Sequence, residues 1–421
     1  MREVRVELPL RGARVSARRR GRRRLRKGGV VIEERYDVAV VGAGPAGSSA
    51  AKAAARKGAS VLLLEKDRDV GYPVRCGEGV RRKELEEHVA VDPKWIAASV
   101  TKFSLTGPKG KEITLDLGPK WEYLILHRRL FDYDLARFAA EAGATVRTSA
   151  YVDNVLKDNG VVTGVTYEYR GERRAVRASA VIGADGVESR VGRWAGIETA
   201  VEPRLMGCCA QVTAANVDVD PTVAAFYHGK DFAPLGYLWV FPKGERIANV
   251  GVGVSGTKDA TRSAREWLDL FLRERFPDAS ILTEVAGGCP SANGLERYSV
   301  PGLMLVGDAG RHVNPLTGAG IPSGMTGGAI AGEIAAAMAR KSTPDLALDF
   351  DARYRRKIGW RHDGYEKVRD KFYSASEERL EELFDLFLEV PPEKRTLRRV
   401  VQHALAKHPK WWKLVFKIFF N

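Results

Sequence analysis

Long apolar runs are absent from this sequence. No stretch approaches the roughly 20 consecutive apolar residues that span a bilayer, so we do not expect an integral membrane protein. Cysteine is scarce as well: the chain of 421 residues has Cys76, Cys208, Cys209 and Cys289, and no CxxC pair. This excludes a disulfide-stapled scaffold, and because the seven histidines show no ligand spacing either, we expect no metal. The N-terminus has no apolar leader, so we expect a cytoplasmic protein.

Basic residues are concentrated in the first 30 positions. Twelve Arg or Lys stand there against Glu3 and Glu7, whereas the whole chain carries a net charge of +15. The run has no apolar periodicity and is typical of a disordered, solvated extension, or of a start site assigned too early. Binding of anionic lipid or RNA by this segment is the alternative interpretation, although we expect no nucleic acid partner.

A strand, a glycine-rich turn and a helix follow in the order that a dinucleotide-binding unit requires. Residues 37–41 form a short buried run, the turn carries Gly42, Gly44 and Gly47, and a small-residue helix continues to near Gly58. Gly42 permits the tight turn, Gly44 lets the backbone approach a pyrophosphate, and Gly47 allows close helix–strand packing. The N-terminus of the helix offers free N–H groups to the phosphates.

The second buried run, residues 60–64, ends at an acid. Glu65 stands where a carboxylate accepts a hydrogen bond from a ribose hydroxyl, and it favours a ribose without a 2′-phosphate. The residues predicted to bind the dinucleotide in this unit are Gly42, Gly44, Ala46, Gly47, Glu65 and Lys66.

Two later segments again pair a buried strand with glycine and aspartate. Residues 180–184 are followed by Asp185 and Gly186, and residues 303–306 lead into Gly307 and Asp308. Asp308, at a strand end, is placed to hold the ribityl or pyrophosphate part of a flavin dinucleotide. Gly320 and Ile321 then open a long small-residue helix, whose first N–H groups are predicted to face the flavin ring.

The ordered set of three motifs resembles the flavoproteins of the p-hydroxybenzoate hydroxylase fold over about residues 35–340. The resemblance implies non-covalently held FAD and an antiparallel sheet covering the reactive face of the flavin. It also implies that Arg128 lies near the flavin, with Arg129 as the competing assignment, and that Val152 lies near the adenine.

Two further segments bear on the substrate. Residues 73–79, PVRCGEG, follow the second strand and contain Cys76. Gly77 and Gly79 indicate that the backbone of this loop passes close to a ligand. Residues 236–244 alternate aromatic side chains, so that Tyr237, Trp239 and Phe241 share one strand face. From the pattern alone this face is packed core or a binding wall. We expect a turn at Pro242–Gly244 and a return strand over residues 247–254.

Both segments are similar to those of the archaeal geranylgeranyl reductases, which saturate the isoprenoid chains of membrane ether lipids. The resemblance implies a polyprenyl ether lipid substrate, a tunnel wall formed by Tyr237, Trp239 and Phe241, and an external electron donor: a ferredoxin, NAD(P)H or another reduced cofactor. Cys76 is the candidate catalytic residue, as proton donor or positioning group; the alternative is a small side chain that lets the substrate pass. Cys208 and Cys209 are neighbours on one strand, so at most one of them faces a cavity and packing is the default expectation; Cys289 has no assigned role.

The expected fold is α/β: a Rossmann-like FAD-binding domain with an interleaved antiparallel-sheet substrate domain and a C-terminal helical region. The predicted segments are residues 1–30 as the basic extension, 31–105, 128–205 and 296–345 as the FAD domain, 106–127 and 206–295 as the substrate sheet, and 346–421 as helices. The aromatic and basic end, residues 409–420, is an interfacial anchor or a docked helix, so peripheral contact with the inner membrane face is expected as one alternative.

Three other functions fit parts of the sequence. One is a flavin monooxygenase of the same fold that hydroxylates aromatic rings. Another is a quinone reductase, which would normally carry clustered cysteines for an iron–sulfur centre. The third is a lipid- or RNA-binding protein that retains a flavin structurally.

Overall fold

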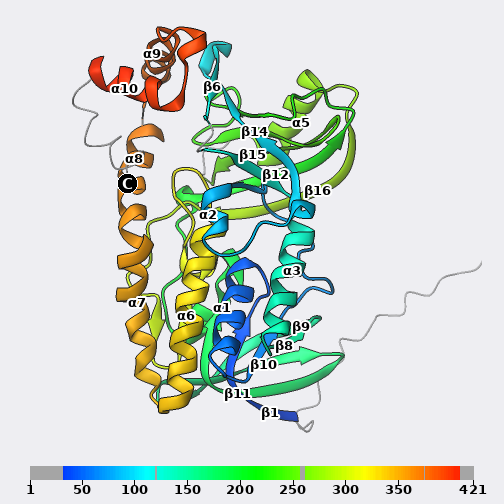
Figure 1. Ribbon diagram of the computed structural model, residues 1–421, viewed down its shortest axis with the longest axis vertical. Helices are drawn as coiled ribbons and strands as arrows, with labels where there is room; N and C mark the ends of the chain where they lie inside the picture. Colours follow the sequence, from blue (N-terminus) through cyan, green and yellow to red (C-terminus); the bar gives the residue numbers. More distant parts are fainter. Residues whose placement is uncertain (1–31, 119–120, 257–260, 374, 408–421) are drawn as a thin grey trace, which may run out of the picture.

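A computed structural model describes residues 32–118, 121–256, 261–373 and 375–407 (Figure 1). The basic segment at residues 1–30 and the aromatic C-terminus at residues 409–420 lie outside these ranges. The described chain contains three sheets with helices packed around them, which confirms the predicted α/β class.

The largest sheet has eight strands and carries the dinucleotide motifs. Its parallel part runs β18–β11–β1–β2–β8, with β17 antiparallel at one edge and the β9–β10 hairpin extending from β11. Residues 38–41 are buried, as expected for a parallel strand covered on both faces. The strands are β1 Ile32–Val41, β2 Val61–Leu64, β8 Thr145–Arg147, β9 Ala150–Asp158, β10 Val161–Tyr169, β11 Glu172–Gly183, β17 Ser299–Val300 and β18 Leu303–Leu305.

Helices α1 (Pro45–Arg56) and α6 (Ile321–Lys341) pack closely against each other beside this sheet (Figure 1). Their approach depends on glycine, because a Cβ on Gly328 would stand 2.1 Å from the carbonyl oxygen of Ala46, and one on Gly332 would stand 2.3 Å from that of Ala50. Gly324, in the first turn of α6, likewise lies next to Ala46 in the first turn of α1. The two helix N-termini therefore open at the same end of the sheet.

A seven-stranded sheet, antiparallel except for the β13–β5 pair, lies above that end, in the order β16–β12–β15–β14–β13–β5–β6 (Figure 1). One face packs on helix α5 (Ala264–Arg275), and the other faces the first sheet's helix N-termini. Its strands are β5 Lys102–Thr106, β6 Glu112–Asp116, β12 Met206–Ala215, β13 Val223–Tyr227, β14 Tyr237–Gly244, β15 Ile247–Ser255 and β16 Ser280–Pro290. Strand β5, which joins this sheet, begins before the predicted domain boundary at residue 105.

The hairpin turn in this sheet differs from the prediction. Strand β14 continues through Gly244, and the chain reverses at residues 245–246, where Arg246 has a φ of +53°. The prediction of a turn at Pro242–Gly244 is wrong, because Pro242 stays in the ladder opposite Ala248. A register shift between Pro242 and Gly244 accommodates the proline, which has no N–H to donate.

A small third sheet and the remaining helices complete the described chain. The sheet contains β3 Gly79–Arg81, β7 Tyr123–Leu126 and β4 Ile96–Val100. Helices α9 and α10 cover the outer end of the seven-stranded sheet, where Phe384 and Val400 pack on Ile113 and Leu115 of β6 (Figure 1). The helices not yet bounded are α2 Arg82–Glu86, α3 Arg128–Glu141, α4 Arg190–Ala195, α7 Asp349–Tyr354, α8 Trp360–Tyr373, α9 Glu377–Leu388 and α10 Leu397–Lys407.

None of the helices in the described ranges combines the length and the apolar character needed to cross a membrane.

Candidate active site

A cavity of about 750 Å³ lies between the two large sheets. Its floor is formed by the glycine-rich turn after β1 and by the N-terminus of α6, and its roof by the inner face of the seven-stranded sheet. Of the predicted residues, those that line it are Gly44, Ala46, Cys76, Gly77, Arg128, Gly186, Tyr237, Trp239, Phe241, Asp308, Gly320 and Ile321. The structure thus brings most of the predicted cofactor and substrate residues together around one space.

The glycine-rich turn is tight at Gly42 and Gly47 and open at Gly44, while its contact with a pyrophosphate stays a prediction. Gly42 has a φ of +98°, and a Cβ there would stand 2.3 Å from the carbonyl oxygen of Ala184. A Cβ on Gly47 would stand 1.9 Å from the carbonyl oxygen of Gly42. A Cβ on Gly44 would meet no atom of the described residues within 4 Å. The backbone at Gly44 therefore faces open space at the start of α1, where a pyrophosphate group fits.

Glu65 lies beside this turn at the end of β2. Its carboxylate accepts hydrogen bonds from the N–H of Ala43 at 2.8 Å and from the N–H of Asp67 at 2.9 Å. Its carbonyl oxygen accepts from Ala150 N at 2.8 Å, which brings the start of β9 next to Glu65. Val152, two residues further on, is buried in the core and does not line the cavity, and Lys66 is exposed. Contacts of Val152 and Lys66 with the dinucleotide stay predictions.

The two predicted aspartates lie at neighbouring strand ends. Asp185 accepts from Val191 N at 3.0 Å through Oδ2, whereas its buried Oδ1 has no hydrogen-bond partner among the described residues. Asp308 lines the cavity, with Oδ1 3.6 Å from the position of a Cβ on Gly320. Burial raises the pKa of both carboxyl groups and outweighs the backbone hydrogen bonds that lower the pKa of Asp185. The open space at Gly44 and the cavity-lining Asp308 fit the pyrophosphate and hydroxyl groups of FAD, whereas Asp185 does not line the cavity and its contact with FAD stays a prediction.

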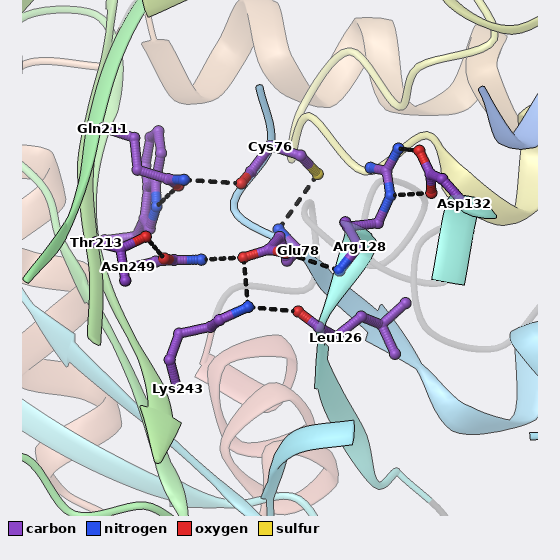
Figure 2. Close-up of polar contacts among 10 residues, drawn as sticks. Cys76, Glu78, Leu126, Arg128, Asp132, Gln211, Thr213, Lys243 and Asn249 are labelled. Atoms are coloured by element: carbon purple, nitrogen blue, oxygen red, sulfur yellow. Dashed lines mark hydrogen bonds and ion pairs between the residues drawn. The ribbon is translucent and has the colours of Figure 1, made fainter. Parts of the chain in front are cut away.

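Arg128 rather than Arg129 lines the cavity. Its guanidinium makes two hydrogen bonds of 2.7 Å to the carboxylate of Asp132, one turn further along α3 (Figure 2). Burial by itself lowers the pKa of Arg128, but the Asp132 carboxylate raises it above its usual range. Arg129 is exposed, with its guanidinium over the Tyr72 ring. Contact of Arg128 with the flavin stays a prediction.

Cys76 is held from two sides in the loop that crosses the cavity (Figure 2). Its Sγ accepts a hydrogen bond from the N–H of Glu78 at 3.2 Å, and its carbonyl oxygen accepts from Gln211 Nε2 at 2.9 Å. Burial raises the pKa of the Cys76 thiol, so the group is protonated at neutral pH. Cys209 and Cys289 also line the cavity, whereas Cys208 is exposed on the opposite face of β12.

The aromatic stripe on β14 is both packed and part of the cavity wall. Trp239 and Phe241 are only 8% and 6% exposed, yet both line the cavity with Tyr237. The Trp239 ring lies on Gly251, where a Cβ would stand 2.3 Å from it, and its Nε1 donates to Gln211 Oε1 at 3.0 Å. The two readings of the sequence pattern, core and wall, therefore both describe these side chains.

The sequence reasoning missed the polar residues that hold this wall in place. Gln211, Asn249 and Lys243 belong to strands of the seven-stranded sheet, and Glu78 to the Cys76 loop (Figure 2). A signal was present in the strand sequences, because Gln211 and Asn249 are amide side chains within otherwise apolar strands. Their partners were not visible, because these lie far away in the sequence.

Comparison with known proteins identifies the family. A model of the geranylgeranyl reductase catalytic domain matches residues 206–289, and a model of FAD-dependent oxidoreductases matches residues 37–234. The chain is 42% identical over 388 residues to digeranylgeranylglycerophospholipid reductase of Methanosarcina acetivorans, covering 90% of this chain and 95% of the relative. It is 41% identical over 357 residues to digeranylgeranylglycerophospholipid reductase 1 of Methanococcoides burtonii, covering 84% and 87%. The chain belongs to the digeranylgeranylglycerophospholipid reductase family.

Solved structures agree with this family. A geranylgeranyl bacteriochlorophyll reductase-like protein from Thermoplasma acidophilum superposes with a TM-score of 0.83 at 35% identity, covering 90% of this chain and 98% of the other. A flavin-dependent brominase has a TM-score of 0.67 at 20% identity, covering 89% of this chain and 99% of the other, and shares the fold alone. As a member of the reductase family the protein is an FAD-dependent oxidoreductase, which confirms the predicted cofactor and enzyme class.

Proposed function

We propose that the protein reduces the carbon–carbon double bonds of geranylgeranyl chains in membrane ether lipids. The observation that carries the proposal is the continuity of the cavity: the dinucleotide cradle at Gly44 and Asp308 and the aromatic wall on β14 line the same space. A polyprenyl chain offers only apolar surface and alkenes, which suit aromatic walls. The relatives named above as digeranylgeranylglycerophospholipid reductases support this substrate class.

The reaction adds a hydride to one alkene carbon and a proton to the other. An isolated trisubstituted alkene has no carbonyl group to take up charge, so it is a poor hydride acceptor. Reduced FAD, when bound, supplies the hydride. The protein has to hold the alkene in line, exclude water and place a proton near the second carbon.

The residues of the cavity match these tasks. Tyr237, Trp239 and Phe241 present apolar rings that exclude water along the chain. The Cys76 thiol carries a proton at Sγ, because burial keeps its pKa above the ordinary value. We propose that Cys76 donates this proton or positions the group that does, with the thiol reprotonated from solvent after each turnover.

The electron donor and the site of lipid uptake stay predictions. The hydride is replenished by an external reductant of the classes named above. The lipid substrate makes uptake from a membrane surface a natural expectation, and the aromatic C-terminal segment predicted to contact it lies outside the described residues.

An anaerobic assay tests the proposed function. Protein reduced with dithionite is mixed with digeranylgeranylglyceryl phosphate, and the lipid is analysed by mass spectrometry for stepwise gains of two hydrogens. We expect such gains with the FAD-loaded protein, and none with FAD-stripped protein under the same conditions. Unchanged lipid mass in this assay, together with hydroxylation of aromatic compounds in a parallel assay with oxygen, would instead support the monooxygenase alternative.

A further inference from the structure

A buried ion pair joins the Cys76 loop to the aromatic wall (Figure 2). Lys243 Nζ lies 2.7 Å from Glu78 Oε2, and the two side chains are 9% and 6% exposed. The two residues are 165 positions apart in the sequence. Taking two charges out of water is costly, and apolar residues of similar volume often stabilise a protein as well as a buried pair does. A buried pair beside a cavity therefore calls for a role other than stability.

The Glu78 carboxylate contacts two other parts of the fold, the β14–β15 hairpin and the start of α3. Oε2 accepts from Lys243 Nζ and from Asn249 Nδ2 at 2.5 Å, which ties it to the β14–β15 hairpin. Oε1 accepts from Arg128 N at 2.9 Å, at the start of α3. Lys243 Nζ also donates to the carbonyl oxygen of Leu126 at 2.7 Å. The pair thus fixes the loop, the β7–α3 junction and the hairpin relative to one another.

Lys243, the member of the pair on the hairpin, lies on the same strand as the aromatic wall. Lys243 follows Tyr237, Trp239 and Phe241 at intervals of two along β14, and Asn249 lies opposite Phe241 in the ladder. The loop end lies against the same wall, because a Cβ on Gly77 would stand 3.1 Å from the Phe241 ring. A shift of the β14–β15 hairpin therefore changes the position of the aromatic wall relative to the Cys76 loop.

Glu78, at the loop end of the ion pair, also determines the position of the Cys76 thiol. Glu78 has a φ of +70°, and in this left-handed conformation its N–H donates to Cys76 Sγ at 3.2 Å. The orientation of the peptide between Gly77 and Glu78 therefore decides where Sγ is held. The Glu78 side chain accepts hydrogen bonds from Lys243, Asn249 and the N–H of Arg128. These contacts fix that peptide.

We propose that Glu78 and Lys243 are positioning residues for the reduction: their ion pair holds the Cys76 thiol at a fixed place against the lipid wall. The inference rests on the proposed function, and it concerns the residues that set the geometry rather than those that react. If the ion pair were only structural, turnover would change only as far as the stability of the fold changes. Under the proposal, turnover falls even in a variant that keeps its stability.

The test compares Glu78→Gln, Lys243→Met and the double variant. Each single change leaves one buried group without its partner, so the melting temperature falls; the double change removes both charges, so it recovers. Turnover per bound FAD, measured below each melting temperature, falls roughly tenfold to a hundredfold in all three variants. The KM for the lipid changes little, since the wall itself remains. Lys243→Arg retains the charge and recovers part of the lost turnover.

A second readout does not depend on the lipid reaction. The rate of Cys76 alkylation by iodoacetamide, mapped by peptide mass spectrometry, rises in the double variant at full FAD occupancy, because without the ion pair the backbone N–H at position 78 is no longer kept directed at Sγ. Glu34→Gln is the matched control: it breaks a partly buried ion pair with Arg147 remote from the cavity. It lowers the melting temperature and leaves both turnover and alkylation unchanged.

The double variant decides the outcome. Normal turnover per bound FAD and a normal alkylation rate in Glu78→Gln/Lys243→Met would overturn the proposal and leave the pair a purely structural feature. Wild-type protein that shows no lipid reduction at all would overturn the proposed function instead, and the alkylation rates would still report whether the pair holds Cys76.

Discussion

At the scale of single residues, the carboxylates around the cradle differ in what they already contact. Glu65 is occupied by two backbone N–H groups, whereas Asp185 has one buried oxygen without a partner among the described residues. Asp308 lies on the cavity surface near the start of α6. Of the three carboxylates, Asp308 alone lines the cavity, and we therefore expect it to accept a hydrogen bond from a bound dinucleotide.

Asp308→Ala is expected to weaken FAD binding at least tenfold. A hydrogen bond to a charged group contributes about 1.5–3 kcal/mol, and the variant has no acceptor at this strand end. The measurement is the dissociation constant of FAD by fluorescence titration of the apoprotein. Asp278→Ala, at an exposed position outside the cavity, is the control and retains normal affinity. Full FAD affinity in Asp308→Ala would reject the role of this carboxylate.

Trp239→Ala is expected to lower both stability and turnover, because its side chain is packed and also lines the cavity. Removing a buried aromatic side chain costs about 3–5 kcal/mol. The matched control is Trp267→Ala: Trp267 is also 8% exposed but packs between α5 and the opposite face of the sheet. The control loses similar stability with normal turnover per bound FAD. Equal turnover losses in the two variants would show that Trp239 acts only through stability.

At the scale of elements, the contact between α1 and α6 places two helix N-termini at the cofactor end of the cavity. Gly328 and Gly332 allow this contact because the backbone of α1 occupies the space of their missing side chains. The sequence indicates a glycine-rich helix over these residues. It does not tell which of the glycines face α1, because that depends on how the helix is rotated in the assembled fold.

Gly328→Ala is therefore expected to destabilise the protein and weaken FAD binding. Its Cβ would stand 2.1 Å from the Ala46 carbonyl oxygen, so α1 has to move; overpacking of this kind costs about 1–3 kcal/mol. The melting temperature and the FAD dissociation constant measure the two effects. Gly324→Ala, whose Cβ would stand at an ordinary 3.5 Å from the Ala46 Cβ, is the control, with an unchanged or higher melting temperature. A similar loss in both variants would contradict the packing argument.

The elements that the sequence predicted well are those with a local pattern. The buried run at residues 38–41, the turn glycines and Glu65 follow one another closely, and each has a role that its residue type requires. Strand β1 begins five residues earlier than predicted, at Ile32, because its polar first half is held by pairing with β11 rather than by burial. The pairing of Glu78 with Lys243 escaped prediction, since it joins two segments that only the folded sheets bring together.

At the scale of the whole molecule, one ion-pair cluster joins strands β1, β8 and β10 of the large sheet. Glu34 on β1 accepts two hydrogen bonds from Arg147 of β8, at 2.8 and 3.0 Å, and one from the Tyr167 hydroxyl of β10 at 2.6 Å. The hydrogen bonds from Arg147 hold the pKa of Glu34 at about 2, below its ordinary value of 4.5. The cluster stabilises three strands that are distant in sequence.

Stability is accordingly expected to fall in acid. The folded-state pKa of Glu34 is depressed, so its contribution is complete above the unfolded value of 4.5 and is lost as the pH falls toward about 2. Glu34→Gln should lower the free energy of unfolding by about 1–2 kcal/mol at pH 7, with the difference vanishing near pH 2. Urea titrations across this range measure it. Glu33→Gln, on a neighbouring half-exposed side chain, is the control; a pH-independent difference for Glu34→Gln would contradict the assignment.

The single cavity that carries both the cradle and the wall has a thermodynamic consequence. A lipid chain lying along Trp239 and Phe241 would share this cavity with a dinucleotide held at Gly44 and Asp308, so the binding of one would affect the binding of the other. By reciprocity, if the lipid raises the equilibrium affinity for FAD by some factor, then FAD raises the affinity for the lipid by the same factor. Under such coupling the holoprotein would be the form that retains the lipid.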